Sequence, residues 1–193
     1  NIDVYADYSE NNQSLNYHEN FSFSIDVSLN QEGFPLSTLN EIHSSPIVCD
    51  LDLNGEKEII FGDHFGKIHA INFVGENVLT NIFPYDTGDQ IWGSPALADL
   101  NLDGFDELIL VSKSKKVYTF DYTGLKWIFE SDSQLIGTPA IGNLNETDEK
   151  EIVIGGYSND TNNFFVLSHL GEPINNIEIF DKNKSGFALY DFD

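Results

Sequence analysis

One sequence pattern recurs along this chain and limits the folds open to it. Each copy holds a Ser-Pro or Thr-Pro pair, an apolar run, an acidic turn and a second apolar run. The full copies span 43–62, 92–111 and 136–155, and an incomplete fourth copy begins at 185. The first residues of the acidic turns lie 49, 44 and 48 residues apart, at Asp50, Asp99, Asn143 and Asp191. A repeat of this length is typical of the blades of a β-propeller.

Each repeat predicts four short β-strands, because β-branched and aromatic residues alternate or run together between Gly, Asn and Asp. In the first copy we expect these strands at about 44–50, 57–62, 67–73 and 78–83. A β-sandwich of irregular hairpins is the alternative, but it does not explain why the same acidic turn follows the same strand. We therefore predict an all-β fold over 34–193, a partial propeller ring of about three four-stranded blades and the start of a fourth. The blade repeats start near 44, 93, 137 and 185.

Residues 1–33 do not match the repeat. The stretch 21–29 alternates strictly and predicts a strand with one apolar face. The residues of that face are Phe21, Phe23, Ile25, Val27 and Leu29. We expect residues 1–33 to end a preceding β module or to form the outer strand of a preceding blade.

The first two acidic turns place oxygen-bearing side chains at positions 1, 3, 5 and 9, with glycine at position 6. Side chains at this spacing converge in a tight loop, and a backbone carbonyl at position 7 completes a shell that suits Ca²⁺. The expected ligands are Asp50, Asp52, Asn54, the Glu56 carbonyl and Glu58 in one loop, and Asp99, Asn101, Asp103, the Phe105 carbonyl and Glu107 in the other. An EF-hand is excluded because position 12, its bidentate glutamate, is here Phe61 or Leu110 within a predicted strand.

The third acidic turn departs from this pattern. Asp148 stands where the glycine is expected, and the turn carries fewer formal charges, so we expect weaker calcium binding there. Its candidate ligands are Asn143, Asn145, Thr147, the Glu149 carbonyl and Glu151. Asp191 and Asp193 are the candidate first ligands of a fourth loop.

The charge of the chain agrees with a cation-binding role. The 32 Asp and Glu residues outnumber 9 Lys and Arg, which gives a formal net charge of −23. Such a chain repels itself when compact, and bound Ca²⁺ would reduce that repulsion. The same balance argues against nucleic acids and anionic membranes as partners, because both are bound through Lys and Arg. No stretch is long and apolar enough to suggest membrane insertion.

The acidic loops, the preceding Ser-Pro or Thr-Pro, and the following Phe61-Gly62 or Gly155-Gly156 resemble the FG-GAP repeat, also called VCBS or integrin-α N-terminal repeat. The resemblance covers about residues 34–193. It implies a propeller of six to eight blades with structural Ca²⁺, found in secreted and cell-surface proteins, including those of the bacterial envelope.

From this resemblance we expect a noncatalytic, calcium-binding module that binds a protein or carbohydrate ligand or serves as a scaffold. We expect the chain to be a segment of a longer protein, with the remaining blades of the same parent chain as partners. The alternative is an accessory propeller of a secreted peptidase or polysaccharide-degrading enzyme, with the active site outside or above this segment. A third possibility is an adhesion module whose loop-bound metal captures a carboxylate of its partner.

Other chemistry is not indicated by the sequence. No arrangement of nucleophile and base predicts a catalytic residue, and the five histidines have no metal-ligand spacing, so zinc is not expected. The segment 116–127 resembles one blade of a PQQ-type propeller, but its Trp and Gly fit blade packing without a cofactor. Cys49 lies in an apolar run, which predicts a buried core residue.

Overall fold

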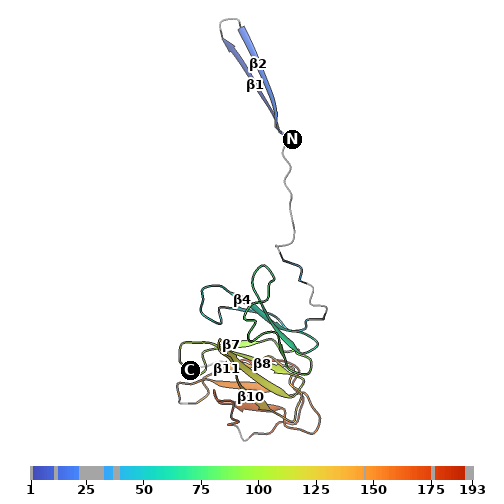
Figure 1. Ribbon diagram of the computed structural model, residues 1–193. Coiled ribbons are helices and arrows are strands. Elements are labelled where there is room, and N and C mark those ends of the chain that lie inside the picture. Colours follow the sequence, from blue (N-terminus) through green and yellow to red (C-terminus); the bar gives the residue numbers. More distant parts are fainter. Residues whose placement is uncertain are drawn as a thin grey trace. The chain divides into compact units, whose positions relative to one another are not determined.

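The computed structural model describes residues 2–10, 13–21, 33–36, 40–145, 147–174 and 177–189. The chain divides into two compact units, Asn1–Gln31 and Glu32–Asp193 (Figure 1). Every element assigned in the described residues is a β-strand, which confirms the all-β prediction. Within that part of the chain, no helix could span a membrane.

The first unit contains a two-stranded antiparallel hairpin. Strand β1 (Ile2–Glu10) pairs with β2 (Gln13–Phe21) in a regular register from Ile2↔Phe21 to Glu10↔Gln13. This hairpin was not predicted from the sequence. The strand predicted over 21–29 lies, beyond Phe21, outside the described residues.

The second unit contains three antiparallel sheets, and in each sheet the strands are neighbours in chain order. The first sheet consists of β3 (Ile47–Cys49), β4 (Glu58–Gly62), β5 (Lys67–Ile71) and β6 (Tyr85–Asp86). The second consists of β7 (Ala96–Ala98), β8 (Glu107–Ser112), β9 (Lys116–Asp121) and β10 (Gly124–Glu130). The third consists of β11 (Ala140–Gly142), β12 (Glu151–Gly155) and β13 (Phe164–Leu167). One sheet per sequence repeat is the arrangement expected for propeller blades.

The fourth strand of the first repeat is not where the sequence predicted it. Instead of a strand at 78–83, the chain turns there, with Leu79 at φ 51° and its carbonyl accepting hydrogen bonds from the amides of Ile82 and Phe83. The outer strand is the short β6, which pairs with β5. Phe83, which we placed in a strand, instead fills the core and is 1% exposed. A side chain that reaches the core from a turn gives the same apolar signal as a strand residue.

Two apolar clusters hold the three sheets together. The first joins residues of the first and second sheets, and in it the Phe83 and Phe120 rings lie 5.4 Å apart. The second joins the second and third sheets, with Val111 and Ile154 among its buried members. Each such side chain contributes about 1.5–3 kcal/mol when fully buried. The first sheet therefore packs against the second, and the second against the third.

Contacts between successive sheets recur at the repeat spacing. The Ser45 amide donates to Ser94 Oγ at 2.9 Å, and the Ser94 amide donates to Thr138 Oγ1 at 3.1 Å. A Cβ on Gly93 would lie 2.6 Å from the Gly137 carbonyl oxygen, so glycine permits this close approach. The turns that lead into the first strand of each sheet thus contact their counterparts in the next sheet.

Candidate metal sites

The first acidic loop joins β3 to β4 and draws three carboxylates together. Oxygens of Asp50, Asp52 and Glu58 all lie within 4.8 Å of one another. The Asp50 carboxylate accepts hydrogen bonds from the amides of Asn54 and Gly55, both at 2.9 Å, and this folds the loop back on itself. Gly55 has φ 92°, a conformation that glycine adopts without strain. The loop concentrates negative charge in the way that an oxygen-ligand cation requires.

The second loop, between β7 and β8, has the same backbone pattern with a different arrangement of charge. Asp99 accepts hydrogen bonds from the amides of Asp103 and Gly104, and Gly104 has φ 91°. Position 3 is Asn101, whose side-chain amide donates to Asp103 at 3.1 Å. No group of three convergent carboxylates is found in this loop within the described residues. The first loop has a similar contact, in which the Asn54 side-chain amide donates to Asp52 at 3.0 Å.

A lysine lies beside the second loop. Lys126 forms an ion pair of 2.8 Å with Asp121, and its pKa is raised mainly by that contact and further by the charges of Glu107 and Asp103. Lys126, Asn101 and Glu107 line the same small hollow. The ammonium group therefore offsets some of the negative charge of this loop, and in the first loop Lys57, at position 8, supplies a positive charge.

The third loop, between β11 and β12, closes on itself through amide side chains. Asn143 donates its side-chain amide to the Thr147 carbonyl, and Asn145 donates to the Glu151 carboxylate. Asp148 is not among the described residues with positive φ, so this loop lacks the left-handed residue that glycine supplies at position 6 of the other two. The predicted ligands Asp191 and Asp193 lie outside the described residues.

In the first two loops, the backbone amide of the position-7 residue donates a hydrogen bond to the side chain at position 5. The Glu56 amide donates to Asn54 Oδ1 at 2.7 Å, and the Phe105 amide donates to Asp103 Oδ1 at 2.9 Å. Glu149 holds the corresponding position in the third loop. These amide contacts fix the chain direction at position 7 in the first two loops.

All three loops share a buried glutamate at position 9. Glu58, Glu107 and Glu151 are 3%, 4% and 3% exposed, although each carries a carboxylate. Each accepts a hydrogen bond of 2.7–2.8 Å from the amide of the residue after the first loop position, and Glu151 accepts a second one from Asn145. The backbone amide donors are Leu51, Leu100 and Leu144. A buried carboxylate with so few donors leaves oxygen lone pairs available to a cation.

The pKa values of Glu58 and Glu107 are raised, as expected for buried carboxylates with few hydrogen-bond donors. Burial is the main cause of the raised pKa of Glu58, and the charges of Asp52 and Asp50 raise it further against the hydrogen bond from Leu51. Burial also raises the pKa of Glu107, with smaller contributions from Asp103 and Asp99. A carboxyl group with a raised pKa is in an environment that favours a bound proton or a bound cation.

A cluster of two histidines and a glutamate was not predicted from the sequence. Glu41, His43 and His64 offer ligand atoms within 4.8 Å of one another, although the histidines show no metal-ligand motif. The signal that could have found them is the repeat itself. His43 and His64 are 21 residues apart, as are Trp92 and Lys113 at the corresponding positions of the second repeat, where the two side chains also meet.

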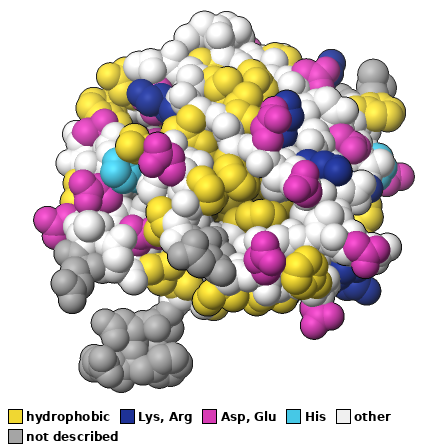
Figure 2. Space-filling view, turned by 90° about the horizontal axis from the view of Figure 1, so that it is seen from below, with side chains coloured by type: hydrophobic (Ala, Val, Ile, Leu, Met, Phe, Trp, Pro, Cys, Tyr) yellow, Lys and Arg dark blue, Asp and Glu magenta, His cyan; other side chains and the backbone are white. Residues whose placement is uncertain are grey.

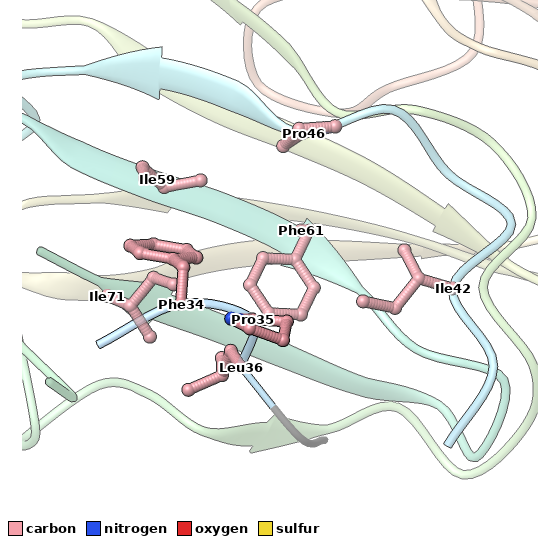
Figure 3. Close-up of a pocket in the computed structure, with 8 residues that line it drawn as sticks. All are labelled: Phe34, Pro35, Leu36, Ile42, Pro46, Ile59, Phe61 and Ile71. Atoms are coloured by element: carbon pink, nitrogen blue, oxygen red, sulfur yellow. The ribbon is translucent and has the colours of Figure 1, made fainter. Parts of the chain in front are cut away.

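An apolar hollow of about 300 Å³ opens on one face of the first sheet. Figure 3 shows its side chains gathered over β4 and β5, with Phe34 beside Ile71 and Pro35 beside Phe61. The other lining residues are Leu36, Ile42, Pro46 and Ile59. All of these lining residues have apolar side chains.

Comparison with known proteins supports the fold. No family model matches the chain, and no curated protein matches it. A crystal structure of BBS1N in complex with ARL6DN matches with a TM-score of 0.54 and 12% identity, over 78% of this chain and 45% of that one. The C-terminal domain of Pseudomonas aeruginosa PilY1 matches with a TM-score of 0.51 and 17% identity, over 67% of this chain and 31% of that one.

These two structures are β-propeller-like, so the class of this protein is defined as an all-β chain with a β-propeller-like fold. At such identities the likeness shows the fold alone. The chain spans less than half the length of either structure. The resemblance to FG-GAP repeats rests on the sequence motifs.

Proposed function

We propose that this chain is a calcium-binding segment of a β-propeller, of the FG-GAP type, that serves as a noncatalytic binding or scaffolding module. The observation that carries the proposal is the convergence of Asp50, Asp52 and buried Glu58 in the loop between β3 and β4. Three carboxylates in one short loop repel one another, and Ca²⁺ both neutralises them and accepts oxygen ligands in flexible geometry. We expect the second loop to be the weaker site because, among the described residues, its carboxylates do not form such a convergent group and Lys126 lies near them.

The role of Ca²⁺ in this proposal is structural. Each acidic loop connects the first two strands of a sheet. A bound cation would therefore stabilise the loop and hold those two strands together. The module suits a secreted or cell-surface protein, because extracellular calcium modules bind with dissociation constants of about 10⁻⁴ to 10⁻³ M. Its ligand is a protein or a carbohydrate rather than a nucleic acid, given the net charge of −23.

We also propose that another blade packs over the apolar hollow on the first sheet. There, Leu36 and Ile42 are 37% and 45% exposed, although Phe61 and Ile71 are already buried. The residues Ile59, Phe61 and Ile71, which line the hollow in Figure 3, are the repeat counterparts of Leu108, Leu110 and Phe120. Those counterparts are 0% exposed because the first sheet covers them. Phe34 likewise corresponds to Phe83, which is buried between the first two sheets.

A blade on the first sheet would close the hollow in the same way that the first sheet covers the second. The end of the second unit seen in Figure 2 also carries hydrophobic side chains near its middle, with Asp and Glu around them. Exposed residues of the C-terminal segment include Ile177, Ile179 and Phe180. The proposal is therefore a module that works within a longer or multimeric ring.

The test of calcium binding is a thermal melt with 1 mM Ca²⁺, with 1 mM Mg²⁺ and with chelator. At 1 mM, which is one- to tenfold over the dissociation constants of extracellular calcium modules, a cation bound only to the native state adds about 0.4–1.4 kcal/mol per site. We expect a clear rise in melting temperature with Ca²⁺ and a smaller one with Mg²⁺, which prefers octahedral water-rich sites. Identical melts in Ca²⁺ and chelator would refute the calcium proposal.

A further inference from the structure

Two histidines and a glutamate meet beside the first sheet, away from the acidic loop. Nε2 of His43 lies 3.2 Å from a carboxylate oxygen of Glu41, and the imidazole rings of His43 and His64 have centroids 5.0 Å apart. His43 precedes β3, and His64 lies in the turn between β4 and β5. The acidic loop joins the other ends of β3 and β4, so the two clusters lie at opposite ends of this hairpin.

The backbone around the cluster is held by polar contacts. The His64 amide donates to the Glu41 carbonyl at 2.8 Å, which ties the two segments directly. Ser44 Oγ donates to the Gly62 carbonyl at 3.0 Å, one residue beyond His43. These contacts hold together the backbone segments that carry the three side chains, which favours a preformed site.

The turn that carries His64 is organised by Asp63, which is 0% exposed. Its carboxylate accepts hydrogen bonds from the side chains of Asn40 and His69 and from the amides of Phe65 and Lys67, at 2.8–3.0 Å. Burial raises the pKa of Asp63, but these donors outweigh burial and hold it below its ordinary value. Four donors therefore satisfy the Asp63 carboxylate, and these hydrogen bonds fix the turn that carries His64.

The second sheet shows that the repeat brings these two positions together. Their repeat counterparts are Trp92 and Lys113, and Lys113 Nζ lies 4.7 Å from the centroid of the Trp92 ring. Neither of those side chains is a metal ligand of the zinc class. Only the first repeat combines this contact with two imidazoles and a carboxylate.

The imidazole of His64 has an unused nitrogen. Within the described part of the chain, its Nδ1 is shielded from solvent and has no hydrogen-bond partner. Buried polar atoms are normally paired, so this atom leaves His64 able to accept a ligand that supplies the missing interaction. Imidazole nitrogen is a preferred ligand of zinc and copper, and far less of calcium.

We propose that Glu41, His43 and His64 form a binding site for a divalent transition metal of the zinc class, separate from the calcium loops. Two imidazoles and one carboxylate are three of the four ligands of a tetrahedral Zn²⁺ site, and water or a donor from a partner takes the fourth position. Bound metal would clip the segment before β3 to the turn after β4. Imidazole ligands favour zinc-class metals and all-oxygen loops favour Ca²⁺, so the two kinds of site can be filled by different cations.

The test uses Zn²⁺ with a competing chromophoric chelator, on the full chain in millimolar Ca²⁺. We expect one Zn²⁺ per chain, and a loss of affinity of at least about tenfold in His43→Gln and in His64→Gln, since even residues behind the ligands cost tenfold or more. Glu41→Gln should weaken binding in the same direction. The matched control is His169→Gln, which removes an imidazole outside the cluster and should leave the affinity unchanged.

Trp92 supplies a positional readout. Its ring stacks on His43 with centroids 5.4 Å apart and lies 6.4 Å from that of His64. Stoichiometric Cu²⁺, a quencher that takes the same ligands, should reduce tryptophan emission, and Trp92→Phe should abolish that decrease. Three results would each overturn the site. They are no stoichiometric Zn²⁺ binding, an affinity in the His43 or His64 variant equal to that of the unchanged protein, and quenching that survives in Trp92→Phe. Unchanged calcium-dependent melting in the histidine variants shows that their fold is intact.

Discussion

The Glu58 carboxylate accepts a hydrogen bond of 2.8 Å from the Leu51 amide, and both residues are buried, at 3% and 1% exposed. This contact closes the first acidic loop from inside. The one amide leaves a buried negative charge only partly compensated, and Asp50 and Asp52 add to it. The fold thus holds a carboxylate where it costs stability unless a cation is bound.

Replacing Glu58 by Gln should change stability in opposite directions with and without calcium. Without Ca²⁺, Glu58→Gln removes a poorly compensated buried charge, so the melting temperature should stay equal or rise. With Ca²⁺, the variant lacks a ligand and should lose most of the stabilisation by this site, about 2.7 kcal/mol at a hundredfold excess.

The matched control for that experiment is Glu130→Gln. Glu130 carries the same charge in an exposed ion pair with Lys116, and surface pairs contribute little. Its variant should respond to Ca²⁺ as the unchanged protein does. A Glu58 variant that loses stability equally in both conditions would show a packing role instead.

The raised pKa of Glu58 predicts a specific dependence of stability on pH. Since the folded form holds the proton more tightly than the unfolded form, this group stabilises the fold below its ordinary pKa of 4.5. That contribution is lost as pH rises through the raised pKa. In chelator, the free energy of unfolding of the unchanged protein should therefore fall more steeply above pH 4.5 than that of Glu58→Gln.

Urea unfolding at several pH values from 4.5 to 7 measures this difference. The other carboxyl groups titrate in both proteins, so their effects cancel in the comparison. Asp63 and Asp121 have lowered pKa values, so they stabilise the fold at and above pH 3.8. That contribution is lost only as the pH falls below 3.8, outside this window. Parallel curves for the two proteins would contradict the raised pKa.

Cys49 should report on the opening of the first hairpin. Burial, followed by the nearby charge of Glu58, raises the pKa of this thiol to about 12, so it stays protonated and unreactive. Cys49 pairs with Glu58 across β3 and β4, at the base of the acidic loop. Labelling of Cys49 with a disulfide reagent at pH 8 should be slow in Ca²⁺ and faster in chelator. A labelling rate that does not depend on Ca²⁺ would show that the cation does not stabilise this hairpin.

The apolar faces predict different outcomes for two equivalent substitutions. Leu108→Ala removes a 0%-exposed side chain between the first two sheets and should cost about 2–5 kcal/mol. Ile59→Ala removes its repeat counterpart at the open hollow and should cost clearly less. If the hollow is a blade-packing face, Ile59→Ala should also reduce self-association of the isolated chain in sedimentation velocity.

A chain that sediments as a clean monomer before any substitution would contradict that packing role. An exposed apolar sheet face normally promotes association. The comparison of the two variants separates the cost of a cavity from the loss of a docking surface, because the sequence positions are equivalent and only the covering sheet differs.

The sequence predicted the sheets of the second unit well, and for a local reason. Strand alternation and turn glycines such as Gly55 and Gly104 act within a few residues, so the repeat located β3, β4 and β5 to within a few residues. It misplaced the fourth strand, because Phe83 reaches the core from a turn. It also missed the hairpin at 2–21, whose mixed polar sequence has no counterpart in the repeat.

The sequence by itself determined the blade repeat and which residues line each acidic loop, since their ligand spacing lies within nine positions of one turn. Only the tertiary structure decided how those loops differ in charge, because Lys126 reaches the second loop from another strand. It also decided that Glu41, His43 and His64 meet, because the hairpin of β3 and β4 brings its two ends together. Contacts made across strands depend on pairing and burial, which no short stretch of sequence carries.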